Sequence, residues 1–309
     1  MSEASATRRL RTRSAADASR RALLVLVLAI AALSCTPVFF RLSELGPTAT
    51  SFHRTFLALP FFAAWMALER RRAPFGVSAA TARRHAAALI AGGAFFAANI
   101  ACYAWAVHFT AIANASLLSN LSPIFVTLGS FLLFGERVGG RFVAAMLGAI
   151  AGTALLVLDK LTLDRGQVLG DGVALVSALC FAAYLVLVAR LRQALPSATI
   201  MLWIGVSGAA GLLSATLAAG ESLMPRTLNG WSMLLGLALI SYALGQGLLT
   251  VALAHLGASF SAVALLSSPV TGALWGWALF AEPISANQAL GGVIILGSVL
   301  AARATSGRD

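Results

Sequence analysis

A single arginine stands well inside an apolar run, in a position where a charged side chain is costly. Arg54 falls in the apolar stretch 49–69, and no acidic residue is close to it there. A charge at the centre of a bilayer costs at least about 2.5 kcal/mol, so a charge kept there usually has a function. A guanidinium in this place could bind a substrate carboxylate or act in a gate. The alternative is that the side chain extends to the outer lipid headgroups.

Uncharged side chains recur at helical spacing in the apolar stretch 111–134. Intervals of four, three, four and three residues place five of them on one helix face: Ser116, Asn120, Pro123, Thr127 and Ser130. An amide that faced lipid would stay unpaired, so this face should point inward. Weaker candidates for the same cavity are Asn99, Tyr103, Tyr184 and Gln246.

Two interpretations of these polar residues compete. They could line a cavity for a zwitterionic or amphipathic solute, or they could join helices by hydrogen bonds worth about 0.6 kcal/mol each. For the serines and threonines we favour hydrogen bonding between helices. For Asn99, Asn120 and Gln246 both interpretations stay open.

Two prolines lie inside apolar stretches at matching places. Pro123 and Pro269 each stand 13 positions before a glutamate, Glu136 or Glu282. A proline removes a backbone hydrogen bond and kinks a helix, and paired kinked helices point to a transport path. Simple packing geometry is the alternative. The two glutamates end their stretches, where they could pair with arginine.

Motifs for bond-making chemistry are missing from the sequence. It contains no HExxH, no GxSxG and no P-loop, and its mid-stretch positions hold no aspartate or glutamate. Cys35, Cys102 and Cys180 lie in apolar runs without a CxxC pair, so we interpret them as buried thiols. We therefore expect no enzyme, no metal and no cofactor.

The elements that must position these residues are membrane-spanning helices. The chain has 309 residues, 59% hydrophobic and 11% charged, and a mean hydropathy of +0.88. Soluble domains carry about 25% charged residues. Runs of about 20 apolar residues span a bilayer, and ten such runs occur, at 22–41, 49–69, 86–107, 111–134, 142–158, 170–190, 198–219, 231–254, 258–280 and 286–302. The sequence predicts an all-α integral membrane protein in contact with lipid.

Positive charge predicts the orientation of the ten helices. With the N-terminus inside, 17 Lys and Arg residues fall on the inner side and four on the outer side. Both termini should be cytoplasmic, in the cytoplasmic (inner) membrane. Because the net charge of +11 arises from these short loops and tails, it does not indicate nucleic acid binding. Thr7-Arg8-Arg9 faintly resembles a twin-arginine signal, but we favour a basic cytoplasmic tail over residues 1–21.

The sequence repeats itself after five helices. Arg41-Leu42, four residues and Pro47 match Arg190-Leu191, four residues and Pro196. Because five is odd, the second half must enter the membrane inverted relative to the first. We expect repeats at 22–158 and 170–303, a linker at 159–169 and a cytoplasmic tail at 304–309.

These motifs resemble the EamA-type members of the drug/metabolite transporter superfamily. The resemblance rests on 114–123 (Asn-Ala-Ser-Leu-Leu-Ser-Asn-Leu-Ser-Pro), 134–137 (Phe-Gly-Glu-Arg), Pro269, 280–282 (Phe-Ala-Glu) and Gly170-Asp171. It implies ten helices, cytoplasmic termini and often export. Ala281 departs from the pattern, since the first half has Gly135 in the equivalent place.

Taken together, the sequence predicts a secondary transporter that works by alternating access. Its substrate would be a small molecule, such as an amino acid or a related polar or amphipathic metabolite, and efflux is the favoured direction. Uptake or exchange of a vitamin-like or nucleotide-like solute is an alternative, as is a membrane channel. Whether the protein forms a homodimer stays open.

Overall fold

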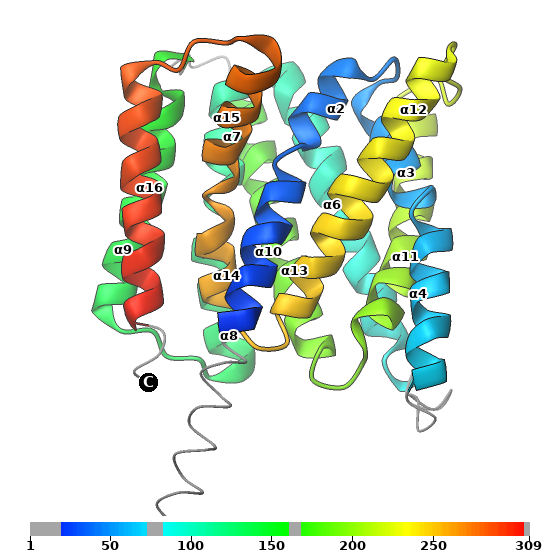
Figure 1. The fold of residues 1–309 in the computed structure, drawn as a ribbon, viewed down its shortest axis with the longest axis horizontal. Helices are drawn as coiled ribbons and strands as arrows, with labels where there is room; N and C mark the ends of the chain where they lie inside the picture. Colours follow the sequence, from blue (N-terminus) through cyan, green and yellow to red (C-terminus); the bar gives the residue numbers. More distant parts are fainter. Residues whose placement is uncertain (1–19, 73–82, 161–167, 306–309) are drawn as a thin grey trace, which may run out of the picture.

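A computed structural model describes residues 20–72, 83–160 and 168–305, and this part of the chain is an all-helical bundle (Figure 1). Nine of its helical segments are long and apolar enough to cross a membrane. The chain is therefore a multi-pass membrane protein. The twin-arginine motif and most of the expected N-terminal tail and linker lie outside the described residues.

The helices follow one another with short connections. Residues 20–33 form the first helix. The elements after it are α2 (Thr36–Leu42), α3 (Pro47–Phe56), α4 (Leu59–Arg72), α6 (Ala86–Phe109), α7 (Ile112–Ser119), α8 (Ser122–Phe134), α9 (Gly140–Val157), the short 3₁₀ turn η1 (Leu158–Lys160), α10 (Val168–Leu191), α11 (Ser197–Ala218), α12 (Leu228–Gly236), the π-helix η3 (Leu237–Gln246), α13 (Gly247–Ala252), α14 (Ala258–Leu265), α15 (Ser268–Phe280) and α16 (Ala286–Thr305).

The observed spans agree with nine of the ten expected stretches. They run over 20–42, 86–109, 112–134, 140–157, 168–191, 197–218, 228–252, 258–280 and 286–305. The stretch 49–69 is also helical, but it is divided into α3 and α4, and neither half reaches spanning length alone.

Prolines divide four of the long helices. Pro37, Pro60, Pro123 and Pro269 each stand at the second position of the new helix, and each preceding helix ends four residues earlier. A proline has no N–H to donate, and its ring collides with the carbonyl at position i−4. The kinks expected at Pro123 and Pro269 are thus present, and Pro37 and Pro60 produce two further breaks of the same kind.

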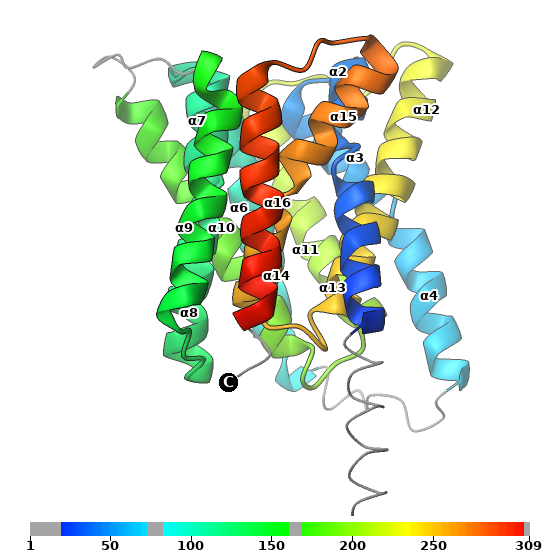
Figure 2. The same ribbon diagram turned by 60° about the vertical axis from the view of Figure 1, so that its left-hand side comes forward.

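Small residues let helices approach closely at the centre of the bundle. α6 packs along α10 and α11. A Cβ added at Gly93 in α6 would stand 2.6 Å from the backbone nitrogen of Gly208 in α11, closer than side chains ever come. In the same way, α9 and α16 form an antiparallel pair at one side (Figures 1 and 2), where a Cβ at Gly291 would lie 2.6 Å from the carbonyl of Gly152.

The residue after α8 and the residue after α15 share an unusual conformation. Gly135 has φ 65° and Ala281 has φ 53°, so both lie in the left-handed region that closes a helix. Ala281 is the only non-glycine residue with positive φ in the described part of the chain. The alanine therefore keeps the backbone shape of the glycine in the first half, at a conformational cost of about 1 kcal/mol.

Candidate functional site

Arg54 lies in a cluster of aromatic side chains at the centre of the bundle. Its guanidinium carbon is 5.5 Å from the ring centre of Tyr242 and 5.7 Å from that of Phe96. The ring of Phe96 also contacts Tyr184 at 5.3 Å, and the Tyr184 hydroxyl accepts a hydrogen bond of 2.7 Å from Gln246. The structure thus brings together three of the residues singled out in the sequence, Arg54, Tyr184 and Gln246.

Four separate elements position this cluster. Arg54 is on the short helix α3, Phe96 on α6, Tyr184 on α10, and Tyr242 with Gln246 on η3. η3 is a π-helix, a rare form that often marks a functional site because it widens the helix and redirects its side chains. The hydroxyl of Thr250 donates back to the Gln246 carbonyl at 2.9 Å, as a local backbone contact.

The guanidinium of Arg54 has no acidic partner. Between described residues, the only ion pair within 4 Å joins Arg41 to Glu282, at a different place. The Nε atom of Arg54 is buried and donates no hydrogen bond to the protein, although the side chain as a whole is partly exposed. Contact with aromatic faces stabilises the cation by about 0.5–2 kcal/mol but supplies no oxygen acceptor for the buried Nε–H. Such an arginine can bind the carboxylate of a solute.

Most of the polar and aromatic side chains around Arg54 are buried in this conformation. Tyr184 and Tyr242 are each 1% exposed, and Gln246 is 5% exposed. Phe62 from α4 packs against Tyr242 at 5.7 Å and Phe181 against Tyr184 at 6.1 Å. Tyr184, Tyr242 and Gln246 are thus shielded from solvent, whereas the Arg54 side chain stays partly exposed.

Asn99 and Tyr103 take part in hydrogen bonds between helices. The Asn99 amide donates to both the carbonyl and the hydroxyl of Ser177 on α10, each at 2.9 Å, and that hydroxyl donates to the Asn99 carbonyl at 3.0 Å. The Tyr103 hydroxyl bonds with the hydroxyl of Ser116 at 2.8 Å. This geometry favours the packing interpretation for both residues, whose role in binding stays a prediction.

The expected polar face of 111–134 is interrupted at its middle. α7 ends at Ser119, Asn120 caps it, and α8 begins at Ser122. Thr127 and Ser130 are buried on α8, and Thr127 contacts the sulfur of Met146 at 3.5 Å. The spacing argument assumed one continuous helix, and the break before Pro123 separates Ser116 from Thr127 and Ser130. Asn120 itself lies half-buried at the break, and its role in binding stays a prediction.

Sequence reasoning missed the aromatic part of the cluster. Phe62 and Phe96 were not singled out, because a phenylalanine in an apolar stretch gives no sign of its neighbours. The π-helix was also missed, since residues 237–246 read as an ordinary helix. The one available signal was that Tyr184 and Tyr242 are two of only three tyrosines in the chain.

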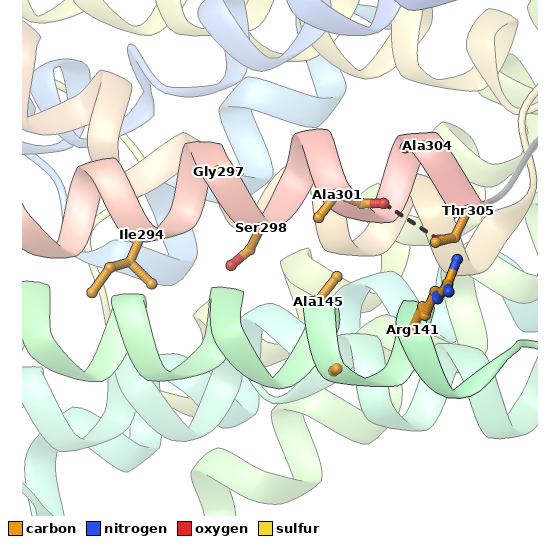
Figure 3. A pocket seen from close by; sticks show the side chains of 9 residues that line it. Arg141, Ala145, Ile294, Gly297, Ser298, Ala301, Ala304 and Thr305 are labelled. Atoms are coloured by element: carbon orange, nitrogen blue, oxygen red, sulfur yellow. Dashed lines mark hydrogen bonds between the residues drawn. The ribbon is translucent and has the colours of Figure 1, made fainter.

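Two surface cavities lie away from Arg54. One of about 620 Å³ runs between α9 and α16, with Arg141 near Thr305 at one end and Ser298 and Ile294 along the cleft (Figure 3). A second, of about 260 Å³, lies at the end of the bundle that carries the C-terminus and is lined by Glu136 and Arg192. Within the described residues, no group of three His, Cys, Asp or Glu side chains could hold a metal ion.

Comparisons with known proteins agree with this architecture. The EamA-like transporter family matches residues 20–158 and 168–303. The pseudopaline exporter CntI of Pseudomonas aeruginosa (strain UCBPP-PA14) is 30% identical over 222 residues, which cover 72% of this chain and 76% of the exporter. An uncharacterized transporter of Archaeoglobus fulgidus is 28% identical over 286 residues, which cover 90% and 94% of the two chains. A solved crystal structure, 19% identical, superposes with a TM-score of 0.80 over 94% of this chain and 98% of that one, and so shares its fold.

The apolar helices define a multi-pass membrane protein, and the family match makes it a transporter. The family matches cover nearly the whole described chain, and the chain belongs to the EamA-like transporter family. The family assignment made from the sequence motifs is thereby confirmed.

Proposed function

We propose that this protein is a secondary carrier that exports small carboxylate-bearing metabolites, with Arg54 as the residue that binds the carboxylate. The observation that carries the proposal is the guanidinium of Arg54, which has a buried Nε and aromatic neighbours but no acidic partner among the described residues. A cation kept in a membrane protein without a counter-ion suits a mobile anionic ligand. Tyr184 on α10 and Gln246 on η3 complete the proposed site.

An amino acid or a related metabolite fits this site better than a purely cationic drug. The rings of Phe96, Tyr184 and Tyr242 offer flat apolar contact, and Gln246 with the Tyr184 hydroxyl offers uncharged hydrogen-bonding groups. The site holds one fixed positive charge, which the carboxylate of a bound solute would neutralise. We therefore propose amino acids and larger carboxylate-bearing relatives as the substrate class.

Export is proposed from similarity to a relative whose name describes it as an exporter of pseudopaline. An inner-membrane location and two cytoplasmic termini are proposed from the excess of arginine on one side of the expected topology. Transport without ATP is proposed because the sequence has no P-loop.

A ten-helix inverted repeat is the architecture we propose for alternating access, with α3 and α4 together as the second span. Helix contacts support it, because helix pairs in contact have repeat-related helix pairs that are also in contact. The contact between α10 and α8 corresponds to the contact between α2 and α15. The contact between α6 and α11 corresponds to the contact between η3 and α3. In Figure 1, α9 and its proposed repeat mate α16 run in opposite directions, as inversion requires.

Transport in proteoliposomes tests this function. Purified protein should catalyse saturable, stereoselective movement of radiolabelled amino acids, and amidation of the carboxylate should abolish competition. A non-saturable flux would indicate a channel. Equal competition by acids and their amides would overturn the carboxylate site while leaving a carrier in place.

The position of Asn120 has its own test. A cysteine placed there, with Cys35, Cys102 and Cys180 replaced by alanine, should react with a small membrane-impermeant thiol reagent, and substrate should slow the reaction. Complete inertness in the presence and absence of substrate would assign Asn120 to helix packing.

A further inference from the structure

One ion pair ties together two helices from different halves of the chain. Arg41, near the end of α2, binds Glu282, which follows α15. The guanidinium also lies over the ring of Phe280, with its carbon 4.5 Å from the ring centre. The pair lies at the end of the bundle opposite the C-terminus, where α2 and α15 come together (Figures 1 and 2).

Both partners have counterparts in the other half of the sequence. Arg41 matches Arg190, because each begins an Arg-Leu pair followed by four residues and a proline. Glu282 matches Glu136, because each lies 13 positions after the proline that breaks its helix and directly after a residue in the left-handed conformation. Exchange of the two halves therefore turns the pair of Arg41 and Glu282 into a pair of Arg190 and Glu136.

The second pair is not formed in this structure. Arg190 is exposed in the last turn of α10, and no ion pair joins it to Glu136 within the part of the chain that the structure describes. The Glu136 carboxylate instead lies against Gly257, the N-cap of α14. A cavity of about 260 Å³ lies at this place, lined by Glu136 together with Ala189, Arg192 and Gln193 from the end of α10 and the residues after it.

We propose that the two pairs are alternating gates, each of which closes one end of the carrier while the other is broken. This structure then has the Arg41–Glu282 gate closed and the Arg190–Glu136 gate open. The proposal rests on the inverted-repeat carrier proposed above, because inversion places repeat-related pairs at opposite ends. It assigns a function to two glutamates and two arginines that the substrate site does not use.

The energetics of exposed ion pairs suit such a gate. Both side chains of the formed pair are more than half exposed, at 58% and 54%. Exposed pairs contribute little to stability, so breaking one is not a large barrier. A weak pair still biases an equilibrium between two nearly equal states, and removing it should shift their ratio about 2- to 5-fold.

Thiol labelling at both ends of the carrier tests the gates without a substrate. The background replaces Cys35, Cys102 and Cys180 by alanine. Ser241→Cys reports access past α2, since Ser241 is buried near the middle of its span and its hydroxyl bonds to that of Thr36, the first residue of α2, at 2.5 Å. Ala189→Cys reports the cavity at the other end.

Glu282→Gln should raise the labelling rate of the cysteine at 241 about 2- to 5-fold and lower that of the cysteine at 189. Glu136→Gln should change both rates in the opposite directions. Exchanging the charges, by Arg41→Glu with Glu282→Arg, should restore the starting rates, which also shows that the variants fold. Arg226→Gln, an exposed arginine at the α2/α15 end, serves as the matched control and should leave both rates unchanged.

Unchanged labelling in both single variants, or changes of the same sign at both ends, would overturn the gates. These outcomes are separate from failure of the carboxylate site. Reciprocal labelling together with equal competition by acids and amides would keep the gates and reject the substrate proposal, whereas carboxylate-selective transport with unchanged labelling would do the reverse.

Discussion

Replacement of Arg54 is the sharpest test of how this transporter recognises its solute. The guanidinium has aromatic faces at 5.5 and 5.7 Å and no acidic partner among the described residues, so a substrate carboxylate would be its counter-ion. Truncating one member of a buried charge pair costs about 2–4 kcal/mol. At 1.4 kcal/mol per tenfold change, Arg54→Ala should weaken binding of carboxylate-bearing solutes about 30- to 700-fold.

Arg54→Lys separates recognition from simple charge. Lysine keeps the positive charge and can still stack on the rings, but it lacks the planar fork that binds both carboxylate oxygens. We therefore expect a large part of the alanine effect to remain in the lysine variant. If Arg54 only extends to the headgroups, lysine should replace it freely, because its stem has similar reach.

The assay is uptake into proteoliposomes at matched protein density, with competition by the acid and by its amide. Arg71→Lys, at the exposed end of α4, is the matched control and should transport like the wild-type protein. Near-wild-type rates in Arg54→Lys would remove Arg54 from the site. An equal loss for acids and amides in Arg54→Ala would show that the residue supports the fold rather than the substrate.

Three further predictions concern packing, backbone and pH. Gly291→Ala should destabilise the protein by about 1–3 kcal/mol, because the new Cβ would meet the backbone of α9 at 2.6 and 2.9 Å. In the control variant Gly297→Ala, on the same helix, the new Cβ meets nothing within 4 Å. Equal melting temperatures for the two variants would contradict this reasoning. Gly135→Ala should lower the free energy of unfolding by about 1 kcal/mol from its positive φ alone, since no atom lies within 4 Å of the added Cβ. Gly139→Ala is also uncrowded but has φ −71°, so it should lower the free energy of unfolding less. The same loss of stability in both variants would refute the conformational cause. Hydrogen bonds from the Thr227 hydroxyl and the backbone N–H of Arg226 lower the pKa of Glu44 in the folded state. The stability that this contact contributes should be fully present above the unfolded pKa of about 4.3 and should be lost as the pH falls through the lowered, folded pKa. Melting curves of Glu44→Gln should therefore depend less on pH in that range than those of the wild-type protein, and identical pH profiles would contradict the prediction.

Much of this fold was predictable from the sequence, for local reasons. Apolar runs of about 20 residues predict helices that satisfy their own backbone hydrogen bonds, as lipid requires. The breaks before Pro123 and Pro269 follow from the missing N–H and the steric conflict at position i−4. The same rule applied to Pro37 and Pro60 would have predicted the division of the first two spans as well. The EamA motifs were sufficient to assign the family.

The candidate site was only partly predictable, because spacing along one helix gives no information about its neighbours. Asn99 and Gln246 looked alike in the sequence, yet one joins α6 to α10 and the other bonds to Tyr184 beside Arg54. Gln246 also lies in a π-helix, which no local pattern in the sequence predicted.

The sequence by itself determined that Arg54 lies in an apolar stretch and that its charge there needs an explanation. Tertiary structure alone decided which side chains surround it, and it placed Phe96, Tyr184 and Tyr242 there from three other helices. It also decided that Arg41 meets Glu282, 241 positions away, while Arg190 and Glu136 stay apart. The physical reason is that a helix fixes the direction of each side chain about its own axis, whereas the packing of helices against one another selects the partner.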